Sequence, residues 1–205
     1  MGGVRPAYDF VKASLLAGKH VVTSNKALVA ACGTELLQIA RDKGLNFLFE
    51  ASVGGGIPLI RPLTGALAGE KIVEIRGILN GTNNYILTKM AKEGQTFEEA
   101  LRKAQELGYA ERNPESDVEG YDTCRKISIL TALATGREVN YEDVYTEGIT
   151  AVTDTDFRYA AALGTCVKLF GSSRMEDGRV SVFVCPIETE RRRNSRPRGG
   201  NRQDA

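Results

Sequence analysis

Asp122 and Lys126 are the residues of this 205-residue sequence whose types and spacing most clearly suggest chemistry. They stand four positions apart at the start of an apolar helical pattern, whose stripe continues through Ile129 and Leu133. The acid and the amine should therefore point inward. An ion pair on a solvated face contributes only about 0 to 1 kcal/mol, whereas a pair on a buried stripe is a candidate for proton transfer or ligand binding. A partly buried structural ion pair is the alternative interpretation of this segment alone.

Two further segments have the composition of a ligand site. Residues 50–58, EASVGGGIP, form a glycine-rich loop in which main-chain amides and carbonyls can turn toward a ligand. This loop is neither GxGxxG nor a phosphate loop with Lys-Ser/Thr, and an ordinary tight turn is the alternative. Asn80-Gly81-Thr82 opens a predicted helix, whose N-terminal amides suit a carboxylate group. Simple N-capping by Asn80 or Thr82 is the alternative there.

Alternating helices and strands should position these groups. Helical patterns cover residues 6–17 and 27–43, each ends at a glycine, and each is followed by a short strand, KHVVTS or LNFLFEA. This alternation predicts parallel βαβ units from the second half of a doubly wound sheet. Ligands bind beyond the carboxyl ends of the strands in such sheets, which is where Lys26 and Glu50 fall.

The rest of the chain reads as a mixture of helices and antiparallel strands. The expected elements are a helix from Pro58, a strand KIVEIRGIL, a helix opened by Asn80, a helix over 96–107 with a Thr96/Glu99 capping box, the helix that carries Lys126, an irregular span near 138–155, and a hairpin with strands near 165–172 and 179–184 turned by Asp177-Gly178. These elements would form a second domain.

The composition excludes several function classes. Lys+Arg 27 against Asp+Glu 26 leaves a net charge of +1, so no overall field favours nucleic acid or membrane. Four cysteines without CxxC spacing and one histidine indicate neither a zinc site nor a disulfide framework. No apolar run approaches the ~20 residues of a membrane span. We therefore expect a cytoplasmic protein with no nucleic-acid or membrane partner.

Residues 188–205 contain six arginines among glycines and polar residues, without any apolar period. We expect a disordered basic tail there, because such a segment cannot bury a core. An RNA-binding arm is the alternative, but the segment lacks the aromatic side chains on which bases usually stack.

Four motifs together resemble the homoserine dehydrogenase family: SNK at 24–26, EASVGGGIP at 50–58, NGTNNYIL at 80–87 and GYAERNPESDVEGYDTCRK at 108–126. The resemblance covers about residues 1–186. It implies NAD- or NADP-dependent interconversion of L-homoserine and L-aspartate 4-semialdehyde, a step of threonine, methionine and isoleucine biosynthesis, by a homodimer.

The fold class that the resemblance implies is α/β, with an α+β catalytic domain attached to a partial doubly wound Rossmann-type sheet. On that basis residues 1–50 would be a remnant of the NAD(P)-binding domain, residues 51–187 the catalytic and dimerisation domain, and residues 188–205 the tail.

The resemblance also assigns roles to individual residues. The catalytic lysines would be Lys126 and Lys26. The residues that bind the amino-acid substrate would be Glu111, Asp117, Asp122, Gly81 and Thr82. The cofactor-binding residues would be Ser24, Asn25 and Lys26. A monovalent cation such as sodium would be coordinated, mostly through main-chain carbonyls, by Glu50, Val53, Gly55 and Ile57.

The family's glycine-rich dinucleotide fingerprint is not found in this sequence, since no GxGxxG occurs, and we expect it to precede residue 1. The chain by itself should then not bind NAD(P) measurably. The alternative to a truncated enzyme is a non-catalytic dimerising or substrate-binding fragment of the same family.

Overall fold

The computed structural model describes residues 3–190, in which helices and strands are mixed along the chain. The α-helices are α1 (Ala7–Leu16), α2 (Lys26–Asp42), α3 (Ile60–Thr64), α4 (Gly81–Glu93), α5 (Phe97–Glu106), α6 (Glu115–Val118), α7 (Tyr121–Thr135) and α8 (Asp154–Ala162). The strands are β1 (Val21–Val22), β2 (Phe47–Leu48), β3 (Glu74–Gly77), β4 (Tyr145–Thr146), β5 (Thr165–Glu176) and β6 (Arg179–Glu190). Two 3-10 turns are η1 (Glu50–Ser52) and η2 (Tyr141–Asp143).

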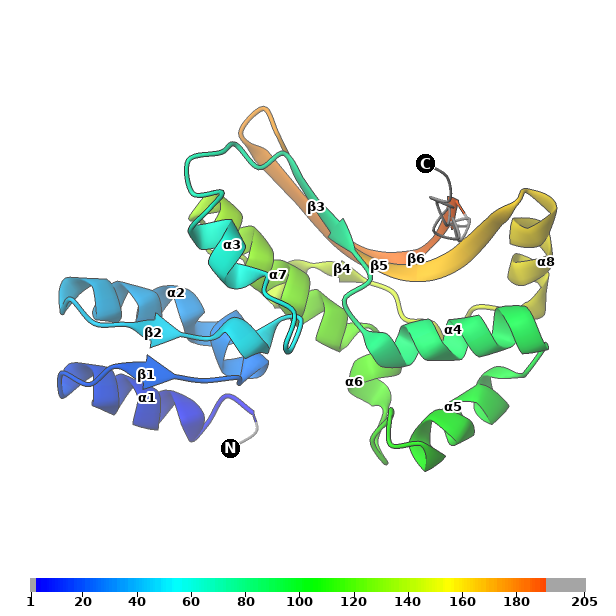
Figure 1. Cartoon of the computed structure of the whole chain (residues 1–205), viewed down its shortest axis with the longest axis horizontal. Coiled ribbons are helices and arrows are strands. Elements are labelled where there is room, and N and C mark those ends of the chain that lie inside the picture. The colour runs from blue at the N-terminus through cyan, green and yellow to red at the C-terminus, as the bar shows by residue number, and fades with distance from the viewer. Residues whose placement is uncertain (1–2, 191–205) are drawn as a thin grey trace, which may run out of the picture.

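The N-terminal part is a small α/β unit in which β1 and β2 lie side by side and parallel, as predicted (Figure 1). Both strands are shorter than the sequence pattern suggested, with two residues each. Helices α1 and α2 pack against them through fully buried Leu15, Leu28 and Leu36. Asn25 caps α2, because its side-chain oxygen accepts a hydrogen bond from the Leu28 amide at 3.1 Å.

The second part is built on a four-stranded sheet with the order β3-β5-β6-β4. Strands β5 and β6 form the predicted hairpin, turned at Asp177-Gly178, where both residues have positive φ. Strand β6 continues to Glu190, beyond the expected end near residue 184, so that residues 188–190 pair with β5. The predicted tail can therefore begin no earlier than 191, and residues 191–205 lie outside the described residues.

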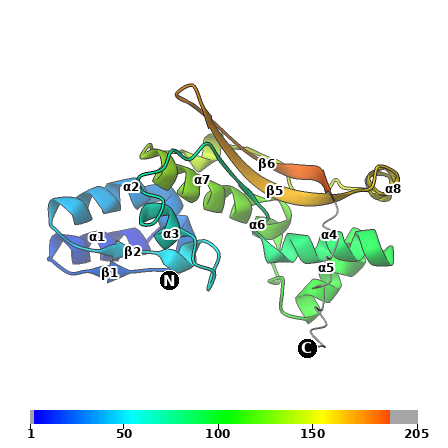
Figure 2. The same ribbon diagram turned by 45° about the horizontal axis from the view of Figure 1, so that its top comes forward.

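Helices α4 and α7 pack on one face of this sheet, as Figures 1 and 2 show from two directions. Gly171 of β5 allows α7 to approach closely, because a Cβ at that position would lie 3.1 Å from side-chain atoms of Ile127 and Thr123. The neighbouring residues of β5 therefore face away from α7. Within the described part of the chain, no helix covers that opposite face.

Helix α7 belongs to both hydrophobic cores. Its Ile127 is buried in the core between α4 and the sheet, whereas Ile129 and Leu130 are buried in the core of the N-terminal unit. The first turn of α7 also lies where the two units meet, because its Asp122 contacts both Lys26 of α2 and Asn80 at the start of α4.

Two further segments differ from the sequence-based expectation. Helix α3 begins at Ile60 rather than at Pro58. The span near 138–155, expected to be irregular, contains η2 and β4 and leads into α8, which the sequence pattern did not predict. Within residues 3–190, no helix is long and apolar enough to cross a membrane.

Candidate active site

Asp122 and Lys126 point inward from the first turns of α7, as predicted. Asp122 is 2% exposed, and its Oδ2 lies 2.5 Å from Nζ of Lys126, whose side chain is 16% exposed. Farther along the same stripe, Ile129 is buried, as expected. Gly120, at the N-terminus of α7, has φ 81°, and a Cβ there would lie 3.3 Å from Val184 Cγ1, so glycine allows the helix to start against the sheet.

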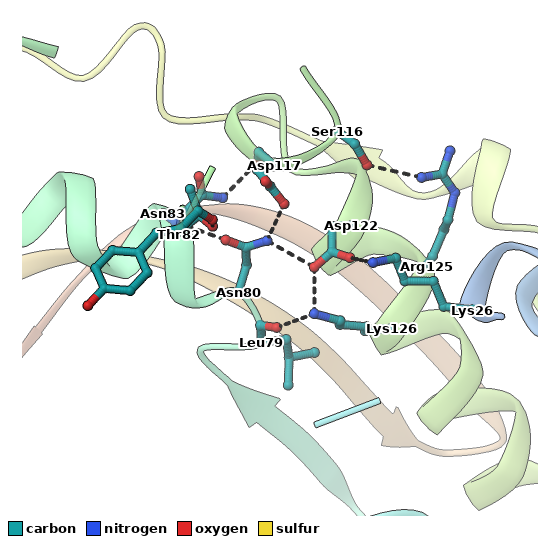
Figure 3. A network of polar contacts seen from close by, with 11 residues as sticks. Lys26, Leu79, Asn80, Thr82, Asn83, Ser116, Asp117, Asp122, Arg125 and Lys126 are labelled. Carbon is teal, nitrogen blue, oxygen red and sulfur yellow. Dashed lines mark hydrogen bonds and ion pairs between the residues drawn. The ribbon is translucent and has the colours of Figure 1, made fainter. Parts of the chain in front are cut away.

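Lys26 contributes a second amine to the same carboxylate. Its Nζ lies 2.5 Å from Asp122 Oδ1, so each oxygen of Asp122 contacts one lysine (Figure 3). Burial alone would raise the pKa of Asp122, but the positive charge and hydrogen bond of Lys126, with those of Lys26 and Asn80, hold that pKa below its usual range. Asp122 is therefore an anion that holds two amines together.

Asp117 lies beside this cluster on α6. Asn80 Nδ2 donates to Asp117 Oδ1 at 2.8 Å and to Asp122 Oδ2 at 2.9 Å, and thus connects the two carboxylates. Burial raises the pKa of Asp117; the Asn80 hydrogen bond opposes this, and the negative charge of Asp122 adds to it. Two neighbouring acids are thus tuned in opposite directions, which is typical of active sites.

The N-terminus of α4 faces the same region. Asn80 caps this helix, because its Oδ1 accepts from the Asn83 amide at 2.8 Å, as the capping alternative predicted. Thr82 Oγ1 donates to the Tyr109 carbonyl at 2.6 Å. A Cβ added to Gly81 would meet no atom within 4 Å, so the space in front of its backbone is open.

Leu79, immediately before the cap, completes the contacts of the catalytic candidate. Its carbonyl oxygen accepts a hydrogen bond from Lys126 Nζ at 2.8 Å. The sequence motifs did not identify Asn80 as a site residue, and they indicated no role for Leu79. The Asn-Gly-Thr motif did predict a cap, but the second use of the asparagine, through its amide nitrogen, depends on residues 37 and 42 positions away.

Glu111 is not brought into this cluster. It is exposed, and among the described residues only its backbone is engaged, through a hydrogen bond from Gln105 Nε2 to its carbonyl at 3.0 Å. Its role in substrate binding stays a prediction.

The Glu50 carboxylate caps helix α3. Its oxygens accept hydrogen bonds from the amides of Leu59, Ile60 and Arg61 at 2.7 to 2.9 Å. Burial would raise the pKa of Glu50, but these amides hold it below the usual value. The three amides explain why α3 begins after Pro58.

The other predicted cation ligands lie in the loop that follows Glu50. Within residues 3–190, the main-chain carbonyls of Val53, Gly55 and Ile57 accept no hydrogen bond. Carbonyl oxygens without a partner, together with a carboxylate, are ligands that suit a hard cation.

The predicted cofactor residues lie at the carboxyl end of β1. Ser24 is exposed, and the Lys26 side chain is 42% exposed. Asn25 donates through Nδ2 to the Gly3 carbonyl at 2.7 Å, in addition to capping α2. Polar groups at this edge of a parallel sheet fit a dinucleotide site.

A separate hollow of about 750 Å³ lies between α2, α3 and the C-terminal half of α7. Cys32, Phe49, Leu63 and Leu133 are among the residues that line it. It includes neither lysine of the cluster nor Asp122. The Asp122 cluster therefore lies outside this hollow.

Comparison with known proteins agrees with the geometry. The family model described as homoserine dehydrogenase matches residues 58–195. A homoserine dehydrogenase of Bacillus subtilis is 45% identical over 186 residues, which are 91% of this chain and 43% of that protein. One of Synechocystis is 48% identical over 169 residues, which are 82% of this chain and 39% of that protein.

Solved structures give the same result. A homoserine dehydrogenase from Thiobacillus denitrificans superposes with a TM-score of 0.90 at 43% identity, over 95% of this chain and 45% of that one. A hyperthermophilic archaeal homoserine dehydrogenase in complex with NADPH superposes with a TM-score of 0.77 at 31% identity, over 93% of this chain and 54% of that one. The expected α/β class is confirmed. The chain spans less than half the length of the Bacillus subtilis and Synechocystis relatives, and it belongs to the homoserine dehydrogenase family.

Proposed function

We propose that the chain is the substrate-binding and proton-transfer part of a homoserine dehydrogenase, which interconverts L-homoserine and L-aspartate 4-semialdehyde. The observation that carries this proposal is the placement of Asp122 between Lys126 and Lys26, inside a chain of this family. A buried carboxylate that fixes two amines orients them for proton transfer and reduces the reorganisation that the reaction requires.

An amino-acid substrate matches the groups around this cluster. Asp117 takes part in no ion pair with any residue from 3 to 190, and its half-buried carboxylate is available for the substrate ammonium. Glu111, in the exposed segment between α5 and α6, would supply a second carboxylate for that ammonium. The open N-terminus of α4 at Gly81 and Thr82 suits the substrate carboxylate.

The lysines handle the proton of the reaction. In the oxidative direction the C4 hydroxyl loses its proton to a neutral lysine amine, the C4–H bond breaks with departure of hydride, and a C=O bond forms. In the reductive direction a charged lysine returns the proton to the oxygen. When bound, NAD(P) supplies the hydride acceptor or donor. Lys126 is better placed than Lys26 for this role, because Asp122 and the Leu79 carbonyl both hold its amine.

Ser24, Asn25 and Lys26 would contact the dinucleotide at the carboxyl end of β1. Two observations support this: the exposure of Ser24, and the half-exposed amine of Lys26, which reaches Asp122 from the same strand end. The relative solved with NADPH shares this part of the fold.

Glu50, Val53, Gly55 and Ile57 would hold a monovalent cation such as sodium. The unpartnered carbonyls support this proposal. Sodium should raise the thermal midpoint of the protein relative to a bulky organic cation at equal ionic strength. An equal midpoint in both salts would contradict the assignment.

The chain would form a homodimer through the outer face of its four-stranded sheet. On that face Phe183 of β6 lies opposite exposed Tyr145 of β4, and Phe170 lies on the neighbouring strand β5. Both phenylalanines face away from the core, against which Val182 packs. Such an uncovered apolar face is typical of subunit contacts. Sedimentation should show a dimer that Phe183→Asp dissociates, whereas Phe10→Asp on α1 should leave it intact.

We infer a cytoplasmic location. All four cysteines are free in the structure, which is consistent with a reducing compartment. Isolation of the protein with a disulfide between any two of them would argue against this.

The experiment that tests the activity is a chimera, in which the aligned residues of this chain replace their counterparts in the Bacillus subtilis relative. We expect L-homoserine-dependent NAD(P)H formation, lost on Asp122→Asn and on Lys126→Met. A well-folded chimera with no activity would overturn the proposal and favour the alternative, a non-catalytic dimerising or substrate-binding fragment. Calorimetry of the 205-residue chain with L-homoserine would then separate a substrate-binding fragment, which should bind L-homoserine, from a fragment that only dimerises.

A further inference from the structure

Asn80 uses every polar atom of its side chain at the point where α4, α6 and α7 meet (Figure 3). Its Oδ1 accepts from the Asn83 amide, and its Nδ2 donates one hydrogen to Asp117 and one to Asp122. The residue is 6% exposed. No other side chain of the standard set offers an acceptor and two donors in this shape, because aspartate lacks the donors and glutamine is longer.

The residue before it contacts the same cluster. The Leu79 carbonyl accepts a hydrogen bond from Lys126 Nζ, and Asp122 Oδ2 contacts both Lys126 Nζ and Asn80 Nδ2. The extended two-residue segment before α4, Leu79-Asn80, therefore touches both members of the acid–amine pair. A shift of this segment would move Lys126 and Asp122 together.

Asp117 is the group that depends most on Asn80. The charged groups that act on its carboxylate are Asp122, Lys26 and Lys126, and its side-chain hydrogen bond comes from Asn80. Asp122 repels Asp117, and the two lysines attract it. Without the amide donor, no hydrogen bond would oppose the burial and the repulsion from Asp122, and Asp117 would take up a proton more readily.

We propose that Asn80 is the positioning residue of this site, which separates the duties of its two aspartates: Asp122 keeps both lysines, and Asp117 stays free for the substrate. The proposal rests on the function proposed above where it refers to substrate. The contact pattern itself involves only this chain.

Two variants separate this role from helix capping. Asn80→Ser retains a good N-cap for α4 but removes the bridge between the carboxylates. Asn80→Asp retains the acceptor and the shape but replaces the donor with a third negative charge. Asn140→Ser is the matched control, because Asn140 also caps a turn, through the Glu142 amide, and donates Nδ2 to an acid, Asp143, at 3.0 Å on the surface.

The first measurement is a carbon-13 NMR titration of the aspartate carboxyls in the 205-residue protein. In Asn80→Ser the titration midpoint of Asp117 should rise relative to wild type, whereas Asn140→Ser should leave it unchanged. Should Asn80→Ser fail to fold, Asn80→Asp carries the same test, with a larger rise. An unchanged Asp117 midpoint in the folded variant would overturn the proposal.

The second measurement is the pH profile of kcat/KM in the active chimera. Displacement of a reacting group by about 1 Å costs about 100-fold in rate. We therefore expect Asn80→Ser to lower kcat/KM by up to about that factor and to move the profile, while Asn140→Ser does neither. A wild-type profile for Asn80→Ser would refute the positioning role. An inactive wild-type chimera with a shifted Asp117 midpoint would instead refute the proposed function and leave the positioning role intact.

Discussion

Replacing Lys126 by methionine in the active chimera should abolish most of the activity while the protein stays folded. The amine of Lys126 lies 2.5 Å from Asp122 and donates to the Leu79 carbonyl at 2.8 Å. Loss of a proton-transfer group typically lowers the rate by about 10²- to 10⁴-fold. This corresponds to about 3 to 5 kcal/mol of the barrier.

The stability cost of the same change should be smaller. Hydrogen bonds to charged groups contribute about 1.5 to 3 kcal/mol each in net terms, and removal of the amine also removes its desolvation cost. Asp122 is not left as an unpaired buried charge, since Lys26 and Asn80 still contact it. A net loss of about 1 to 3 kcal/mol is compatible with folding, because domains are stable by about 5 to 15 kcal/mol.

Arg125→Met is the matched control for this prediction. Arg125 precedes Lys126 on the same helix but points about 100° away around it. Its guanidinium lies 5.6 Å from the Tyr141 ring centroid and donates to Ser116 Oγ at 3.3 Å. Steady-state kinetics and circular dichroism should show a fall in kcat for Lys126→Met alone, with both variants folded. Equal falls for the two variants, or a fall that follows lost helicity, would refute the assignment of Lys126.

Three further predictions concern stability. Asp122→Asn should lower the thermal midpoint most near neutral pH. A carboxylate with a lowered pKa stabilises the fold fully above its unfolded pKa, about 3.9, and this stabilisation is lost as the pH falls through the folded pKa. A difference in midpoint from wild type that does not shrink below about pH 4 would contradict this prediction. Glu50→Gln should lower the thermal midpoint by weakening the cap of α3, whereas Glu70→Gln at an exposed position should not, and equal midpoints would show that the cap contributes nothing. Gly120→Ala should destabilise the protein more than Gly164→Ala, since both residues have positive φ but, of the two, only Gly120 has neighbours within 4 Å of a new Cβ. Denaturant unfolding midpoints of the two variants test this, and equal midpoints would contradict it.

Local patterns predicted the features of this fold that depend on near neighbours in the sequence. The i, i+4 spacing placed Asp122 and Lys126 on the buried stripe, and the Thr96/Glu99 capping box forms as expected. The hairpin turn at Asp177-Gly178 was likewise predicted from the sequence, because few residue pairs adopt positive φ at two successive positions. In each case the sequence signal and the structural cause lie within a few residues.

Features set by distant contacts were harder to predict. Helix α8 has the short residue Asp156 in its capping box and buries only Phe157 and Ala160, so its apolar period is weak. The start of α3 is set by Glu50, which lies outside that helix. The bridging contacts of Asn80 require α4, α6 and α7 to meet at one point, and no periodic pattern in the sequence predicts that meeting.

The three groups that contact Asp122 depend on packing to different degrees. The Lys126 contact lies within α7 and persists whenever that helix forms. The Asn80 contact requires α4 to lie against α7, and the Lys26 contact requires α2 to pack against α7, whose Ile129 and Leu130 complete the N-terminal core. Lys26 is also the more exposed lysine. Loosening the packing of the N-terminal unit on α7 would therefore release Lys26 first and leave the Asp122–Lys126 pair intact.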